Sequence, residues 1–257
     1  MIPSALDHLQ EIAPPRRRRL AVFLDYDGTL TPIVNQPTQA VLSDLTRQTV
    51  RALAAHVPVA VLSGRDLDDI RQRVDIEGIV YAGSHGFDIA GPRGLRKQVA
   101  TEFLPIMDAA EKELKEKLAG IHGVLLERKR FSVAAHYRQA NENGVNKVMR
   151  ALNEEVARHG ELRTIAGKKL FELQPNIDWN KGRAVFWLLE TLGLEQPEVL
   201  PLYIGDDLTD EDAFRALRQR GVGIVVSELP RPTAARYALK SPREVERFLR
   251  EIVARLL

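Results

Sequence analysis

The 257-residue chain has no cysteine, a formal net charge of only +2 and no long hydrophobic run. The absence of cysteine excludes disulfide bonds, thiolate metal sites and cysteine nucleophiles. The nearly balanced charge gives no reason to expect a nucleic acid as partner. No apolar run approaches the roughly 18 residues of a membrane helix, and the N-terminal segment MIPSALDHLQEIAPP lacks the basic-then-apolar order of a secretory signal. We therefore expect a cytoplasmic protein, a monomer or a weak oligomer, that acts without a membrane or a nucleic acid.

The chain does contain enough apolar material for a core. Hydrophobic residues make up 44% of it and charged residues 28%, a balance that argues against disorder. Its length favours one large domain or two smaller ones. One charged block stands out, the arginines at positions 16–19, directly before the first apolar run. A block this short is predicted to be a solvated flank rather than a contact for a polyanion.

Short apolar runs alternate with helical patterns at both ends of the chain. Five runs are predicted to be buried strands: Leu20–Leu24, Val57–Leu62, Ile79–Ala82, Leu200–Ile204 and Val222–Val226. Four helices are predicted between and after them: Ser43–His56, Lys181–Leu192, Thr209–Arg218 and Ser241–Leu257. In the first helix we expect Ser43 as N-cap and Leu45, Val50, Leu53 and Ala54 on the buried face. The alternation predicts an α/β fold with a doubly wound, Rossmann-like parallel sheet.

The middle of the chain has a different pattern. Two predicted helices alternate with two predicted hairpins, in the order Met107–Leu118, Val124–Glu127 with Phe131–Tyr137, Val145–Arg158, and Arg163–Ile165 with Lys169–Leu173. The second hairpin is expected to turn at residues 166–168. This order indicates an α+β module rather than more parallel sheet. We therefore expect residues 105–175 to form a domain inserted into a core made of residues 1–104 and 176–257.

The segment LAVFLDYDGTLTPI, residues 20–33, carries the strongest chemical signal. Asp25 and Asp27 end a buried strand, and residues two apart on a strand share one face. Two carboxylates so close repel each other, and a divalent cation such as Mg²⁺ removes the conflict. We expect the loop at Gly28 to turn backbone N–H groups toward an anion. Together these features indicate Mg²⁺-assisted phosphoryl transfer to an aspartate, against the alternative of a solvated strand end.

Other strand ends carry polar residues of complementary type, and in open α/β sheets ligands bind beyond the carboxyl ends of the strands. The three segments are Ser63-Gly64-Arg65, Gly83-Ser84-His85-Gly86 and Gly205-Asp206-Asp207-Leu208-Thr209-Asp210. Lys181 begins a later helix, where the helix dipole disfavours a cation. That misfit favours a functional role for Lys181. Carboxylates, a hydroxyl and a lysine are the groups that phosphoryl transfer to an aspartate requires.

Four segments, DYDGTLTPI, LSGR, NKGRA and GDDLTDEDAF, occur in that order and resemble the motifs of the haloacid dehalogenase-type phosphatases. Two more, AGSHGFDI and LERKRFSVAAHYR, are similar to trehalose-6-phosphate phosphatases. The resemblance spans residues 20–214. It implies Mg²⁺-dependent hydrolysis of trehalose 6-phosphate to trehalose and phosphate, and a possible functional pairing with a trehalose-phosphate synthase. It also implies that the inserted domain is a cap that recognises the sugar.

The resemblance assigns the catalytic roles motif by motif. Asp25 would attack phosphorus and form an aspartyl-phosphate. Asp27 would protonate the departing sugar oxygen and later deprotonate the attacking water. Ser63 would donate a hydrogen bond to the phosphoryl oxygens, and Lys181 would neutralise their charge.

The resemblance also implies the Mg²⁺ ligands. These are the Asp25 carboxylate, the backbone carbonyl of Asp27 and the Asp206 carboxylate. Asp207 and Asp210 would be further ligands, directly or through water, or would orient Lys181. For Asp210 an equal alternative is that an acid in a first helical turn stabilises the helix dipole regardless of function.

Candidate substrate contacts lie in both parts of the chain. In the inserted domain they are Glu127, Lys129, Arg138 and Glu172, which the resemblance places around the glucose ring. Strand alternation puts Glu127 and Lys129 on one face, and such groups suit vicinal hydroxyls because carboxylates accept and cations donate hydrogen bonds. The alternative is an ordinary solvent-facing hairpin. At the strand ends of the core the candidates are Gly64, Arg65, Ser84 and His85. For Arg65 an ion pair with Asp66 or Asp68 is an equal alternative.

Three other functions remain open from the sequence. One is the same chemistry on another sugar phosphate, such as sucrose phosphate or a mannosyl phosphate. The second is a catalytically silent sugar-phosphate sensor or a regulatory partner of a synthase, which the complete set of catalytic residues disfavours. The third is a mutase, in which the aspartyl-phosphate returns its phosphoryl group to a sugar, and the interpretation of the cap as a disaccharide site disfavours it.

Overall fold

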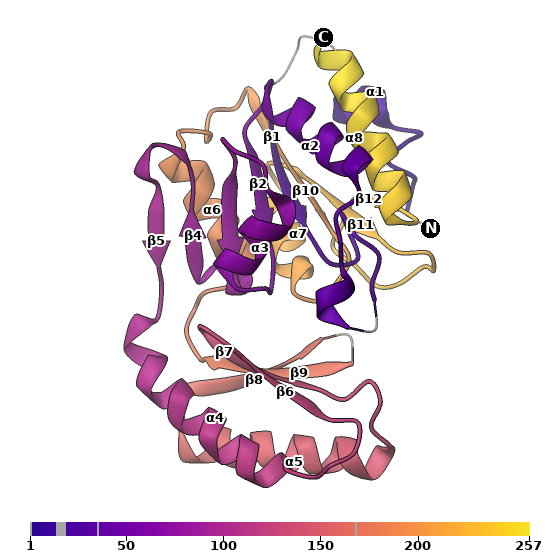
Figure 1. The fold of residues 1–257 in the computed structure, drawn as a ribbon. Helices are drawn as coiled ribbons and strands as arrows, with labels where there is room; N and C mark the ends of the chain where they lie inside the picture. The colour runs from indigo at the N-terminus through magenta and orange to yellow at the C-terminus, as the bar shows by residue number, and fades with distance from the viewer. Residues whose placement is uncertain (1, 14–18, 35, 168) are drawn as a thin grey trace. The chain divides into compact units, whose positions relative to one another are not determined.

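The computed structural model describes residues 2–13, 19–34, 36–167 and 169–257 (Figure 1). The chain divides into two compact units. The first consists of Met1–Lys97 and Trp179–Leu257, and the second of Gln98–Asp178. The segment 105–175, predicted from the sequence to be an inserted domain, lies within the second unit. Of the predicted arginine block, only Arg19 lies within the described residues.

The first unit is built on an eight-stranded sheet with the order β12-β11-β10-β1-β2-β3-β4-β5. The strands are β1 Arg19–Asp25, β2 Val59–Leu62, β3 Val80–Gly83, β4 Asp88–Ala90, β5 Arg96–Gln98, β10 Val199–Gly205, β11 Val222–Val226 and β12 Tyr237–Leu239. Neighbours from β12 through β3 pair in parallel, and β3 pairs with β4 antiparallel. The α/β class with a parallel sheet is confirmed, and so are the five predicted strands.

Helices cover both faces of this sheet (Figure 1). They are α1 Leu9–Ile12, α2 Asp44–Ala54, α3 Leu67–Val74, α6 Lys181–Thr191, α7 Asp210–Leu217 and α8 Pro242–Leu256. In β1, Val22 and Leu24 pack in the core formed with α2, α3 and α8, whereas Ala21 and Phe23 pack in the core formed with α6 and α7. Because β1 is buried on both faces, its sequence is apolar without alternation.

The predicted start of α2 is confirmed, but one residue of its buried face is wrong. The hydroxyl oxygen of Ser43 accepts a hydrogen bond from the N–H of Thr46 at 3.1 Å, which satisfies a free N–H of the first turn. Val50 and Leu53 are fully buried, whereas Leu45 is 55% exposed. The first buried residue of α2 is Thr46 rather than Leu45, so the buried face of the helix begins one position later than the apolar residues alone predicted.

The second unit contains a four-stranded antiparallel sheet with the order β6-β7-β9-β8. Its elements are α4 Leu104–Leu118, β6 Leu125–Lys129, β7 Ser132–His136, α5 Glu142–Arg158, β8 Leu162–Gly167 and β9 Leu170–Pro175. The two helices pack on one face of the sheet, where Leu114 and Leu152 meet Val133 and Leu173. The predicted turn at residues 166–168 includes position 168, which lies outside the described residues.

Among the residues that the structure describes, none of the helices combines the length and the apolar character needed to cross a membrane.

Candidate active site

Three neighbouring strands bring their carboxyl ends together at one edge of the large sheet. Asp25 of β1 lies opposite Leu62 of β2, so Ser63 follows directly on the neighbouring strand. On its other side β1 pairs with β10, which ends at Gly205, directly before Asp206. Residues far apart in the sequence therefore meet where ligands bind in open α/β sheets.

The ammonium group of Lys181 joins two carboxylates at this edge. Its Nζ lies 2.7 Å from Oδ1 of Asp25 and 2.6 Å from Oδ1 of Asp210, and all three side chains are buried. Lys181 is the first residue of α6, which Asn180 caps by accepting a hydrogen bond from a backbone N–H. Since a helix N-terminus disfavours a cation, the two carboxylates are what stabilise Lys181 in this position.

Asp210 uses both of its oxygens inside the protein. Oδ1 accepts from Lys181 and, at 2.6 Å, from the hydroxyl of Tyr203 in β10. Oδ2 accepts from the backbone N–H groups of Asp206 and Asp207, each at 2.9 Å. Asp210 thus orients Lys181 and fixes the turn after β10. Tyr203 was not predicted from the sequence to belong to the site. The available signal was that it is a single tyrosine in an apolar strand, because a buried tyrosine hydroxyl needs a hydrogen-bond partner.

The pKa values of Lys181, Asp210 and Asp25 follow from their burial and from the excess of negative over positive charges around them. Burial opposes the charge on Lys181, but the attraction of Asp210 and Asp25 outweighs it and raises the pKa of Lys181 well above its usual value. Burial acts to raise the pKa of Asp210, but Lys181 outweighs it and lowers that pKa. Burial raises the pKa of Asp25 well above its usual value, Lys181 opposes this, and Asp210 and Asp206 add to it. Asp25 therefore needs additional positive charge nearby to act as an ionised nucleophile.

The residues at this edge fit a divalent cation. Among the described residues, Asp25, Asp206 and Asp210 form the acidic group that could hold a metal, with one ligand atom of each within 4.8 Å of the others. Lys181 supplies one positive charge for these three negative ones. Carboxylate oxygens are the ligands of a hard cation such as Mg²⁺. Because Asp210 already accepts four hydrogen bonds, Asp25 and Asp206 are the better direct ligands.

Gly28 makes room for this acidic group. A Cβ built on Gly28 would lie 2.1 Å from Oδ2 of Asp206, and the residue has a φ of +84°. Only glycine adopts this backbone conformation without strain and leaves space for the carboxylate. Several N–H groups of the predicted anion-binding loop are used within the loop itself. Gly28 donates to the carbonyl of Thr31, and Leu30 and Thr31 donate to the carbonyl of Tyr26, because the tight turn closes on itself.

The segment after β2 packs against the segment after β3. The N–H of His85 donates to the carbonyl of Ser63 at 2.8 Å. A Cβ on Gly64 would lie 2.7 Å from Cε1 of His85, so the imidazole ring lies directly over Gly64. Ser84 donates from its hydroxyl to Asp66 at 2.8 Å and is buried. Its geometry therefore shows a contact that joins the two segments rather than a group open to substrate.

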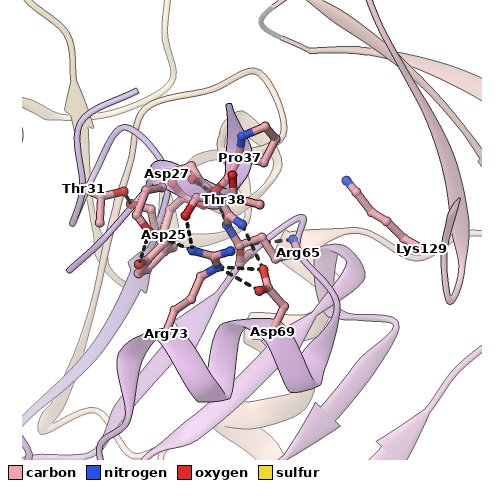
Figure 2. Close-up of polar contacts among 12 residues, drawn as sticks. Asp25, Asp27, Thr31, Pro37, Thr38, Arg65, Asp69, Arg73 and Lys129 are labelled. Atoms are coloured by element: carbon pink, nitrogen blue, oxygen red, sulfur yellow. Dashed lines mark hydrogen bonds and ion pairs between the residues drawn. The ribbon is translucent and has the colours of Figure 1, made fainter. Parts of the chain in front are cut away.

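The carboxylates that Arg65 contacts are those of Asp27 and Asp69 rather than that of Asp68 (Figure 2). Its Nε and one terminal nitrogen donate to the two oxygens of Asp27 at 2.7 and 2.8 Å. The other terminal nitrogen donates to Asp69 at 2.9 Å. Asp69 is four residues from Arg65, a spacing that lets the two side chains meet, and this spacing was the missed signal. Arg65 therefore binds the residue predicted to be the general acid.

In the second unit, the sheet face opposite α4 and α5 carries the predicted sugar contacts. Register places Glu127 and Glu172 on either side of Ala134, in one row across the sheet. Glu127 lies 2.8 Å from Nε2 of His136, and the hydrogen bond with His136 lowers the pKa of Glu127 against the opposing effect of burial.

The other acid of this row is also paired. Lys129 donates to Glu172 at 3.0 Å, and the hydroxyl of Ser132 donates to the same oxygen. Arg138 lies two residues beyond the end of β7, outside the regular strand. This face thus carries prearranged acceptors and donors of the kind that bind hydroxyl groups.

The fold is that of the haloacid dehalogenase-like hydrolases. A solved structure of such a hydrolase from Bacteroides thetaiotaomicron has a TM-score of 0.64 and covers 93% of this chain and 100% of its own, at 16% identity, which is a likeness of fold.

Closer relatives give the particular family. A model of the trehalose-phosphatase family matches residues 23–243. The chain is 42% identical to the probable trehalose-phosphate phosphatase D of Arabidopsis thaliana, over 98% of this chain and 72% of the relative. The C-terminal domain of trehalose-6-phosphate phosphatase from C. albicans has a TM-score of 0.82 and 25% identity, covering 99% of this chain and 98% of its own. The chain belongs to the trehalose-phosphatase family, which confirms the resemblance seen in the motifs.

Proposed function

We propose that this chain is a Mg²⁺-dependent phosphatase that hydrolyses trehalose 6-phosphate to trehalose and phosphate through an aspartyl-phosphate on Asp25. The observation that carries the proposal is the buried contact of Lys181 with Asp25 and Asp210, with Asp206 beside them at the end of the sheet. One phosphoryl group can thereby contact the nucleophile Asp25, the ammonium group of Lys181 and a metal ion held by the acidic group.

In the first step, an oxygen of Asp25 attacks phosphorus and the bond to the sugar oxygen breaks. Lys181 neutralises charge on the phosphoryl oxygens, and Asp210 keeps its ammonium in place. Ser63, buried next to Asp25, donates its hydroxyl to the same oxygens. The Asp25 carboxylate, the backbone carbonyl of Asp27 and the Asp206 carboxylate would hold Mg²⁺, with Asp207 as a further ligand directly or through water. The bound ion would supply further positive charge to the phosphoryl group.

Asp27 protonates the departing sugar oxygen, which as an alkoxide is a poor leaving group. In the second step Asp27 takes a proton from the water that attacks the aspartyl-phosphate. Splitting one displacement into two lets a single carboxylate serve as acid and then as base.

Sugar recognition belongs to the polar sheet face of the second unit, which acts as a cap. Glu127 and Glu172 accept hydrogen bonds from sugar hydroxyls, and Lys129 and Arg138 donate to them. In the first unit, Arg65, Gly64, Ser84 and His85 were the candidates. Of these, His85 over Gly64 is the one we keep as a substrate contact, because Ser84 is occupied by Asp66 and Arg65 by Asp27. A synthase that joins glucose units and leaves a 6-phosphate is the class of enzyme that would supply the substrate.

The test is steady-state phosphate release from trehalose 6-phosphate, sucrose 6-phosphate and glucose 6-phosphate, each with Mg²⁺ and with EDTA. We expect the highest kcat/KM for trehalose 6-phosphate and no activity in EDTA. Asp25→Asn should abolish release while the circular dichroism spectrum stays native. A higher kcat/KM for another sugar phosphate would replace the substrate, and full turnover by Asp25→Asn would end the assignment of the nucleophile.

A further inference from the structure

Arg65 donates hydrogen bonds to both carboxylate oxygens of Asp27, and it makes two further hydrogen bonds (Figure 2). One terminal nitrogen donates to Oδ2 of Asp69 at 2.9 Å, and the other also donates to the carbonyl of Pro37 at 2.8 Å. The guanidinium lies 5.5 Å from the ring centre of Tyr26. The side chain of Arg65 is 10% exposed, whereas that of Asp27 is 41% exposed. The arginine is therefore the fixed member of the pair.

Asp69 is itself fixed by a second arginine. Nε of Arg73 donates to both oxygens of Asp69, at 2.8 and 2.9 Å. A terminal nitrogen of Arg73 donates to the carbonyls of Thr38 and Ala40. Burial acts to raise the pKa of Asp69, but the hydrogen bonds from Arg73 and Arg65 outweigh it and lower that pKa. The four side chains thus form one chain of alternating charge, Asp27–Arg65–Asp69–Arg73, attached to the backbone of residues 37–40.

This geometry sets a requirement on turnover. A general acid must bring an oxygen within about 2.6–3.2 Å of the atom that it protonates, yet both oxygens of Asp27 accept from Arg65 here. Asp27 must therefore give up at least one of these hydrogen bonds when it serves the substrate. A buried guanidinium that loses its carboxylate is strongly destabilised unless another anion remains. Asp69 is that anion.

We propose that Asp69 is a positioning residue that keeps Arg65 in place while Asp27 moves between Arg65 and the leaving sugar oxygen. The inference rests on the proposed role of Asp27 as acid and base. Without the carboxylate of Asp69, Asp27 is the one anion of the described residues that pairs with Arg65. Asp27 then gives up its hydrogen bonds with Arg65 less readily, and proton transfer to the sugar oxygen slows.

The experiment compares Asp69→Asn with Asp68→Asn. Asp68 lies in the same first turn of α3 and is exposed, so its substitution removes the same favourable interaction with the helix dipole but no contact with Arg65. The first turnover is followed after rapid mixing with Mg²⁺, using trehalose 6-phosphate and p-nitrophenyl phosphate. The leaving group of p-nitrophenyl phosphate departs without a proton, so its first step does not need the acid.

For Asp69→Asn we expect the first-turnover rate with trehalose 6-phosphate to fall at least about tenfold, with little change in KM. This loss is smaller than the roughly 10²–10⁴-fold contribution of a general acid itself. The burst of p-nitrophenolate should stay near the wild-type rate, Asp69→Glu should restore part of the loss, and Asp68→Asn should match the wild type. An equal loss with both compounds, or no loss with either, overturns the proposal. If Asp69→Asn does not fold, the same comparison between Asp69→Glu and wild type decides. Lack of trehalose 6-phosphate hydrolysis by the wild type would instead count against the proposed function, and alkyl phosphates that the wild type does hydrolyse would then take its place in the comparison.

Discussion

Replacing Asp210 by Asn separates an internal ion-pair partner from a direct metal ligand. Asparagine keeps the shape but removes the charge that faces Lys181 at 2.6 Å. Its NH₂ group must also face donors, because the two carboxylate oxygens accept from Lys181, Tyr203 and two backbone N–H groups. Breaking a buried ion pair by removing one partner costs roughly 3–5 kcal/mol. For a chain of this size we expect the Tm to fall by about 10 °C.

The assay is thermal unfolding in EDTA together with phosphate release across a range of Mg²⁺ concentrations. Asp212→Asn is the matched control, because Asp212 lies in the same first turn of α7 and forms a solvent-exposed ion pair with Arg215. We expect less than about 1 kcal/mol from the control. If Asp210 acted mainly as a metal ligand, the Asp210→Asn protein would keep its Tm in EDTA and regain activity in excess Mg²⁺. That result would make Asp210 a metal ligand rather than an internal partner of Lys181.

The same variant gives a pH dependence with a fixed sign. The folded pKa of Asp210 is lowered, so its stabilisation is complete above the unfolded value of about 4 and is lost as pH falls through the folded value. The difference in Tm between wild type and Asp210→Asn should therefore shrink in acid below about pH 4. A difference that grows on acidification contradicts the assignment.

Three other substitutions test separate parts of the structure. Gly28→Ala should abolish Mg²⁺-dependent phosphate release. Gly78 has a similar φ of +80° but open space around its Cβ position, so Gly78→Ala should lower stability and leave activity unchanged. Equal losses of activity in the two variants would contradict the close approach of Gly28 to the Asp206 carboxylate. Glu127→Ala should reduce kcat/KM for trehalose 6-phosphate far more than for p-nitrophenyl phosphate, and equal reductions would remove Glu127 from sugar recognition. Leu53→Ala should lower the free energy of unfolding by roughly 2–5 kcal/mol, as measured by denaturant titration. Leu45→Ala should change the free energy of unfolding by less than about 0.5 kcal/mol, and an equal loss in both variants would contradict the exposure of Leu45.

The long apolar strands and the motifs were predictable because they are local signals. The uninterrupted apolar run of β1 leaves few alternatives to a strand buried on both faces, and the order of the motifs identified the family. The short strands β4, β5 and β12 were missed, since three residues each give too little alternation for a prediction.

The polar contacts could be predicted only in part. The place of Lys181 at a helix start predicted a functional role, and the resemblance implied Asp207 or Asp210 as the residue that orients it. The contact of Lys181 with both Asp25 and Asp210, and the bidentate contact of Arg65 with Asp27, depend on side-chain conformations and on pairing between distant segments. Tyr203 was missed for the same reason, whereas Asp69 was missed although its four-residue spacing from Arg65 is a local signal. The roles of the site residues and the bounds of the inserted domain stay predictions.

The location of the phosphoryl group during turnover decides whether Asp25 is the nucleophile. The protein is mixed with trehalose 6-phosphate and Mg²⁺, quenched in acid within the first turnover, reduced with borohydride and mapped by mass spectrometry. We expect a reduced residue at position 25, formed from the aspartyl-phosphate of Asp25, and its absence when Asp25 is replaced by Asn. A phosphoryl group on another residue, or trehalose release at full rate with no covalent intermediate, would contradict Asp25 as the nucleophile.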